Sequence, residues 1–137
     1  MVYKKSYTPV IVIYLMSIFL SEAIAETIKP DWVKVGEGTI ALGSVQSYVD
    51  MNDIKRVNAD IISFRFATNV VSANASNIIT VLLNCKNDLY NVIDDRVYSG
   101  LFGIGAASDS ISHGKDFIVV KGTQFESVSK LVCAKKV

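Results

Sequence analysis

Two stretches of the chain alternate apolar and polar side chains, and this alternation constrains the fold more than any other feature. In residues 60–68, one face of the alternating pattern carries Ile62, Phe64 and Phe66. In residues 78–85, the corresponding face carries Ile79, Val81, Leu83 and Cys85. A period of two residues is typical of a half-buried antiparallel strand. The sequence therefore predicts a domain built around an antiparallel β-sheet.

Shorter patterned segments complete this sheet. We expect further strands over residues 32–36, 45–49, 89–98 and 116–120, which gives about six strands. Residues 38–43 predict a turn or hairpin, and Asn52 and Asp53 can begin a single helical turn. Asp94 and Asp95 interrupt the apolar phase of residues 89–98, which indicates a bulge or an edge position.

The C-terminal segment is predicted to be a helix. Thr123 and Glu126 have the spacing of a capping box, with Thr123 as the N-cap residue. The residues that then share one helical stripe are Phe125, Val128 and Val132. Glu126 and Lys130 form a favourable i,i+4 pair on the outer face. The fold class is therefore α+β, with this helix packed on the sheet.

The chain contains two cysteines, Cys85 and Cys133. In an exported protein an even pair predicts one disulfide, which here would join the helix to the strand that ends at Cys85. Chain-entropy arguments assign such a cross-link about 4 kcal/mol of stability. The alternatives are two separate buried thiols or a catalytic thiol, although no His lies near either Cys in the sequence.

The first residues resemble a secretory signal peptide. Lys4 and Lys5 precede an apolar run from Val10 to Leu20, and Ala23-Ile24-Ala25 has the small-x-small pattern of a cleavage site. Cleavage between Ala25 and Glu26 would leave residues 26–137 as one domain. The alternative is an uncleaved membrane anchor, but the apolar run is too short for a ~30 Å hydrocarbon core. We therefore expect no stable membrane span after cleavage.

Charge and composition exclude several classes of partner. The 137 residues include 14 Lys and Arg against 13 Asp and Glu, and removal of residues 1–25 leaves equal numbers of each sign. A nucleic-acid binder carries a strongly basic surface, so nucleic acid is not an expected partner. With one His and two Cys, a metal site built from several such ligands is nearly excluded, and no cofactor is expected.

Candidate catalytic residues are few and poorly arranged in the sequence. His113 lies near Asp109, Asp116 and several serines, but a solvated loop histidine explains it better than a catalytic triad. Asp94 and Asp95 are adjacent on a predicted strand, so they point to opposite faces and cannot easily share a substrate. We therefore expect no catalytic residues and no enzyme.

Other candidate binding residues also have simpler explanations. Asp50, Asp53 and Asp60 lack the spacing of a calcium loop. Trp32 could be a ligand platform, but a core position is the commoner role of a single early Trp. The glycine-rich segment at residues 100–105 lacks the order of a phosphate loop. Residues 100–114 instead predict a long surface loop, which is where binding sites commonly lie.

Taken in order, these segments resemble the bacterial surface-adhesin protein E family. The residues that carry the resemblance are the segments 32–36, 47–50, 54–56 and 63–66, followed by Asn84-Cys85 and a capped helix with Cys133. The resemblance covers roughly residues 31–133. It implies a single domain with an antiparallel sheet packed by a C-terminal helix. The best-known members of this family lie on the surface of Gram-negative bacteria and bind host matrix and serum proteins, and some form homodimers.

The resemblance and the residues together predict an exported, non-catalytic module that binds a protein partner. The partner would be a host matrix or serum protein, or a protein of the bacterial envelope. The protein would lie in the periplasm or on the outer cell surface of a Gram-negative bacterium, or be secreted. The alternative function is a periplasmic accessory or inhibitor protein that plugs an enzyme cleft with residues 100–114.

Overall fold

The computed structural model describes residues 28–137, so the predicted signal segment and its cleavage site at Ala25 and Glu26 lie outside the described residues. The regular elements are β1 (Trp32–Ile40), β2 (Gly43–Asp50), β3 (Lys55–Arg56), β4 (Ile61–Val70), β5 (Ala75–Asn84), β6 (Leu89–Tyr98), β7 (Asp116–Ile118) and α1 (Gln124–Ala134). Two 3₁₀ turns, η2 (Val71–Ala73) and η3 (Leu101–Gly103), lie between them.

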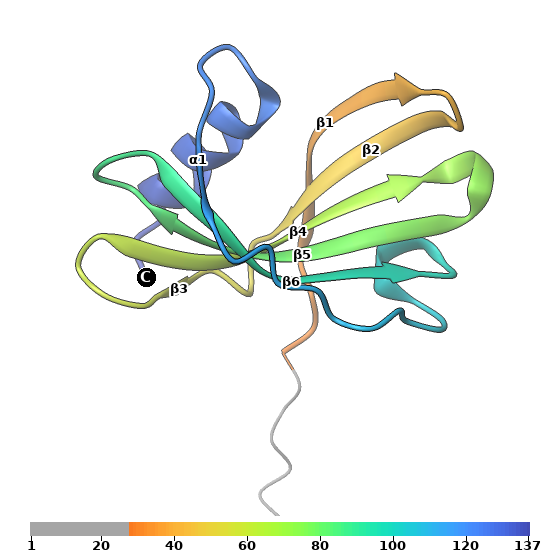
Figure 1. The fold of residues 1–137 in the computed structure, drawn as a ribbon, viewed down its shortest axis with the longest axis horizontal. Helices are drawn as coiled ribbons and strands as arrows, with labels where there is room; N and C mark the ends of the chain where they lie inside the picture. Colours follow the sequence, from red (N-terminus) through yellow and green to blue (C-terminus); the bar gives the residue numbers. More distant parts are fainter. Residues whose placement is uncertain (1–27) are drawn as a thin grey trace, which may run out of the picture.

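The strands form one curled antiparallel sheet with the order β1-β2-β4-β5-β6-β7, and the short β3 also pairs with β4 (Figure 1). β4 and β5, each of 10 residues, form the centre of this sheet, where they pair over their whole length. Helix α1 packs on the sheet and is joined to it by a disulfide. The predicted α+β architecture is therefore confirmed.

The two ends of the sheet are covered on opposite faces. In β4, Ile62 and Phe64 are buried near one end, whereas Ala67 and Asn69 are buried near the other. Successive side chains of a strand point to opposite faces, so this change from even to odd positions moves the buried side across the sheet. The single apolar face expected for residues 60–68 is therefore correct only for the first half of β4.

The buried side chains therefore form two cores, one at each end of the sheet. The first core lies beneath α1. Its fully buried side chains are Val49, Ile62, Phe64, Val81, Leu83, Val128 and Val132. Phe125 packs against Phe64 and Phe66, with ring centroids 6.3 and 6.1 Å away. The Sγ atoms of Cys85 and Cys133 are 2.05 Å apart, which confirms the predicted disulfide between strand and helix.

Local structure differs from the prediction in the first hairpin and after it. β1 continues to Ile40, and the turn is confined to Ala41 and Leu42, because Thr39 still pairs with Ser44. The segment at Asn52 and Asp53 forms a turn and no helix. The side chain of Asp50 accepts the backbone N–H of Asn52 at 3.1 Å, and this contact stabilises the turn.

The predicted capping box does not form at the start of α1. The Thr123 hydroxyl donates to the Val120 carbonyl at 2.6 Å, so it is not available to the first helical turn. Glu126 instead accepts the backbone N–H of Gly122 at 2.6 Å, one residue earlier than the box requires. The Glu126–Lys130 pair is confirmed, with Oε1 and Nζ 2.7 Å apart.

Candidate functional site

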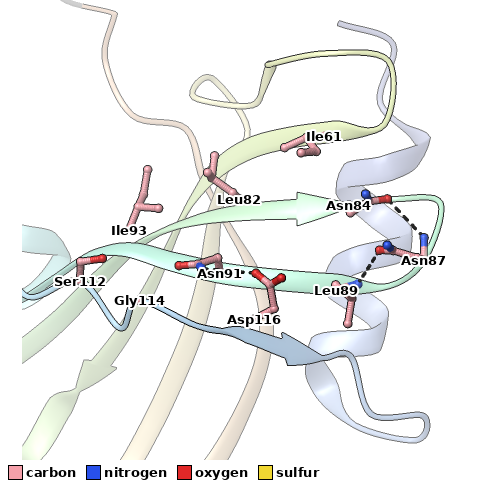
Figure 2. A pocket seen from close by; sticks show the side chains of 10 residues that line it. All are labelled: Ile61, Leu82, Asn84, Asn87, Leu89, Asn91, Ile93, Ser112, Gly114 and Asp116. Atoms are coloured by element: carbon pink, nitrogen blue, oxygen red, sulfur yellow. Dashed lines mark hydrogen bonds between the residues drawn. The ribbon is translucent and has the colours of Figure 1, made fainter.

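The face of the sheet opposite α1 is uncovered at the helix end of the molecule and forms a hollow of about 410 Å³ (Figure 2). We call this surface the open face. It is lined by Ile61, Leu82, Asn84, Asn87, Leu89, Asn91, Ile93, Ser112, Gly114 and Asp116. Val81 is buried under α1, and its neighbour Leu82 therefore points into this hollow.

The strand register explains why these residues gather. Leu82 pairs with Asn91, Asn84 pairs with Leu89, and Asn91 in turn pairs with Asp116 of β7. Ile93 lies on the same face as Leu89 and Asn91, because side chains alternate along β6 and these three residues are spaced two apart. The bulge predicted in this strand is present beside it, where the β5–β6 register shifts between the pairs Thr80–Asp94 and Val81–Val92.

The polar groups of the open face are mostly uncharged. Asn84 accepts the backbone N–H groups of Lys86 and Asn87, so its side chain orders the β5–β6 turn. The Asn91 amide donates to Asp116 at 3.3 Å, and Asp116 is the one charged residue that lines the hollow. Large apolar side chains with few charges among them are typical of protein–protein interfaces, in which charged residues are depleted at the core.

The segment predicted as a long surface loop, residues 100–114, is folded back on the sheet. The N–H groups of Ser108, Ile111 and His113 donate to carbonyl groups of β6 at 2.8–3.1 Å. Isolated bridges join Ala107 to Tyr98 and Ile111 to Asp95. These backbone groups satisfy the outer edge of β6, so residues 107–113 are held along the sheet and do not project from it as a free tip.

The first part of this segment covers the second core, which we define as the buried side chains at the end of the sheet farther from α1: Ala67, Asn69, Ser76 and Ile78. Phe102 lies 4.8 Å from Tyr48 and 6.3 Å from Trp32, measured between ring centroids. Its backbone N–H donates to the buried Asn69 side chain at 2.9 Å. Ser76, which is also buried, donates to the Gly100 carbonyl at 2.6 Å. Trp32 is thus half-buried against Phe102, which agrees more with a packing role than with a ligand platform.

The one histidine is held by a carboxylate. His113 Nε2 lies 2.8 Å from Asp95 Oδ2, and the other oxygen of Asp95 accepts from the Asn77 amide at 2.6 Å. No serine hydroxyl is hydrogen-bonded to His113 among residues 28–137. The described part of the chain therefore brings together a His–Asp pair but no bonded nucleophile.

Asp94 and Asp95 point to opposite faces of β6, as predicted. Asp94 is bound by the Ser110 hydroxyl and by Arg96, whose Nε lies 3.1 Å from it. The hydrogen bond from Ser110, followed by Arg96, lowers the pKa of the Asp94 carboxyl below its ordinary value. Asp94 thus stays ionised at neutral pH and ties residue 110 to β6.

A cluster of charges that the sequence analysis did not assemble lies at the end of β2. Arg65 Nη2 donates to the buried Asp50 at 2.5 Å, and the guanidinium lies 5.3 Å from the centre of the Trp32 ring. Arg65 Nε is 3.1 Å from Asp53, but without the geometry of a hydrogen bond. The sequence feature that could have indicated this cluster is Arg65, a charged residue on the polar side of an otherwise apolar strand.

These aspartates serve the fold and do not form a metal site. Asp50 and Asp53 both face Arg65, and Asp50 also accepts the Asp31 backbone N–H at 2.9 Å. Across residues 28–137 no group of three or more His, Cys, Asp or Glu side chains could hold a metal ion. Within the same range, no helix is long and apolar enough to cross a membrane.

The comparisons with known proteins identify the family. The family model described as Surface-adhesin protein E matches residues 32–134, which spans every strand and the helix. Neither the curated proteins nor the solved structures give a match. Because the family match covers well over half of the sequence, the chain belongs to the surface-adhesin protein E family.

Proposed function

We propose that this protein is an exported, non-catalytic adhesin-like module that binds a protein partner through the open face. The observation that carries the proposal is the uncovered sheet face, on which Leu82, Leu89 and Ile93 are interleaved with asparagine amides. Surfaces of this composition bury well against a protein, because few charges have to be desolvated. The family match supports a role in adhesion at the cell surface.

The partner we propose is a host matrix or serum protein, or a protein of the bacterial envelope. The open face contains only one charged lining residue, Asp116. Recognition would therefore rest on shape and apolar contact, with weak dependence on salt. We also propose that residues 1–25 are a signal peptide removed between Ala25 and Glu26, which N-terminal sequencing of the exported protein tests.

The binding proposal is tested with immobilised host proteins. Whole serum proteins and a reconstituted basement-membrane matrix are presented to the purified protein, and binding is measured by surface plasmon resonance at two salt concentrations. Ile93→Asp places a charge on the open face and should weaken binding at least tenfold, since a buried unpaired charge is costly. Proteinase treatment of intact cells then separates a surface location from a periplasmic one.

His113→Ala is the matched control, since it changes an exposed polar side chain at the edge of the same region. It should leave binding within about 1 kcal/mol of the wild type, as for a residue outside a hot spot. Equal binding of the wild type and Ile93→Asp would contradict the proposed surface. Hydrolysis of any of these proteins by the wild type, lost in His113→Ala, would instead indicate an enzyme.

A further inference from the structure

The end of the sheet farthest from α1 is free of charge. Residues 38–49, 66–85 and 97–108 contain no Asp, Glu, Lys or Arg. These stretches hold the β1–β2 turn, the β4–β5 turn and η3. Figure 1 shows the two turns projecting side by side at the same end of the sheet, away from α1. The charged residues of the described chain lie outside these stretches, and the nearest to the first turn on β1 are Lys34 and Glu37, which pair with each other.

Large apolar side chains project from this uncharged end. Leu42 in the first turn is 66% exposed, and Ile104 after η3 is 70% exposed. Ile40 and Val71 are also exposed, at 46% each. We call these four residues the apolar end. They are not covered by the rest of the described fold, and large exposed apolar side chains gathered at one end of a molecule mark an interaction site.

The polar groups of these turns are largely hydrogen-bonded within the protein. The Ser72 hydroxyl donates to the Leu42 carbonyl, which ties the first turn to η2. The Asn74 N–H donates to Val71, and the Ile104 N–H donates to Leu101, both at 3.1 Å. Internal hydrogen bonds lower the cost of moving a turn from water into an apolar medium.

We propose that the apolar end inserts into the interface of a zwitterionic lipid bilayer. Leu42 and Val71 belong to two turns that project from the same end of the sheet (Figure 1), and projecting turns suit insertion between lipids better than the fit of a flat protein interface. The side chains are aliphatic, the turns are uncharged, and their backbone groups are internally bonded. Since no Lys or Arg accompanies them, attraction to anionic lipids does not contribute. This surface is separate from the open face and does not depend on the proposed function.

The test is binding to phosphatidylcholine vesicles in a flotation assay at physiological salt. Protein that lacks residues 1–25 is used, because the apolar run in that segment would bind vesicles by itself. The fold is complete without it, since residues 28–137 contain the whole sheet, the helix and the disulfide. Leu42→Asp should lower the vesicle partition coefficient by roughly tenfold or more, the value expected when one buried leucine is lost. Ile104→Asp should have a similar effect.

Ile118→Asp is the matched control, because Ile118 is 69% exposed but lies on β7 at the other end of the sheet. It should bind vesicles like the wild type, and so should the open-face variant Ile93→Asp. Absence of wild-type binding, or equal binding by Leu42→Asp, would overturn the proposal. So would light scattering that shows self-association abolished by Leu42→Asp, since the apolar end would then face a second copy of the chain.

Discussion

Phe102 is the residue whose role departs most from the sequence prediction. It stands in a glycine-rich segment that reads as a loop, yet its φ of 55° lies in the left-handed region that bulky residues avoid. The strain is offset by the contacts with Tyr48 and Trp32 and by the hydrogen bond to Asn69. The Phe102 side chain, held in this way, covers the second core.

Phe102→Ala should therefore destabilise the protein by about 2 kcal/mol, since a partly buried aromatic is lost and the Tyr48 ring is uncovered. Chemical denaturation monitored by circular dichroism measures the change. Ile104→Ala, two residues away and 70% exposed, is the control and should stay within about 0.5 kcal/mol of the wild type. Equal stability of Phe102→Ala and the control would mean that residues 100–104 are the free loop expected from the sequence.

At the scale of single elements, the sequence predicted those that obey one simple period. The first half of β4 around Phe64 and the helix stripe of Val128 and Val132 were predictable, because within each of these stretches the apolar residues fall on one face. The change of buried face between Phe64 and Ala67 was not, since it depends on η3 covering the opposite face. The open face was also missed, because its residues become neighbours only through strand register.

The start of α1 should show a defined pH dependence through Glu126. The hydrogen bond from Lys130, and then that from the Gly122 N–H, lower the pKa of Glu126 below its ordinary value of 4.5. A lowered pKa in the folded state stabilises the protein above pH 4.5, and this contribution is lost as the pH falls through the folded-state value. Glu126→Gln should thus lower the melting temperature at pH 7, and the difference should shrink by pH 3. A difference in melting temperature that persists at pH 3 would show that Glu126 stabilises the protein through packing and not through its charge.

The disulfide joins two elements that are far apart in the sequence. Cys85 follows β5 and Cys133 lies in α1, at a sequence separation of 48. Replacing both with Ser should lower the free energy of unfolding by about 4 kcal/mol, because the unfolded chain gains the freedom of that loop. Urea denaturation of the variant and of the oxidised wild type measures this. The variant should still fold, since the side chains beneath α1 remain buried without it; unchanged stability would contradict the estimate.

At the scale of the whole molecule, one sheet supports two separate cores on opposite faces. α1 covers one end with Val128 and Val132, whereas η3 covers the other end with Phe102. At each end of the sheet, one face is covered and the opposite face is exposed. The open face, proposed to bind protein, is one such reverse side, opposite α1. The apolar end, proposed to bind lipid, lies beyond the second core.

This arrangement predicts that the two ends unfold with different free energies. The central amides of β4 and β5 near Phe66 and Ile79 lie between the two cores and should exchange most slowly in hydrogen-exchange experiments. Without the disulfide, α1 loses its covalent link, so amides of residues 124–134 should lose protection first. The hydrogen bonds of Asn69 and Ser76 to residues 100–103 do not depend on that link, so the second core should keep its protection. Mass spectrometry of the exchanged double-serine variant makes the comparison, with the oxidised wild type as reference. An equal loss of protection at both ends would show that the two cores unfold as one unit.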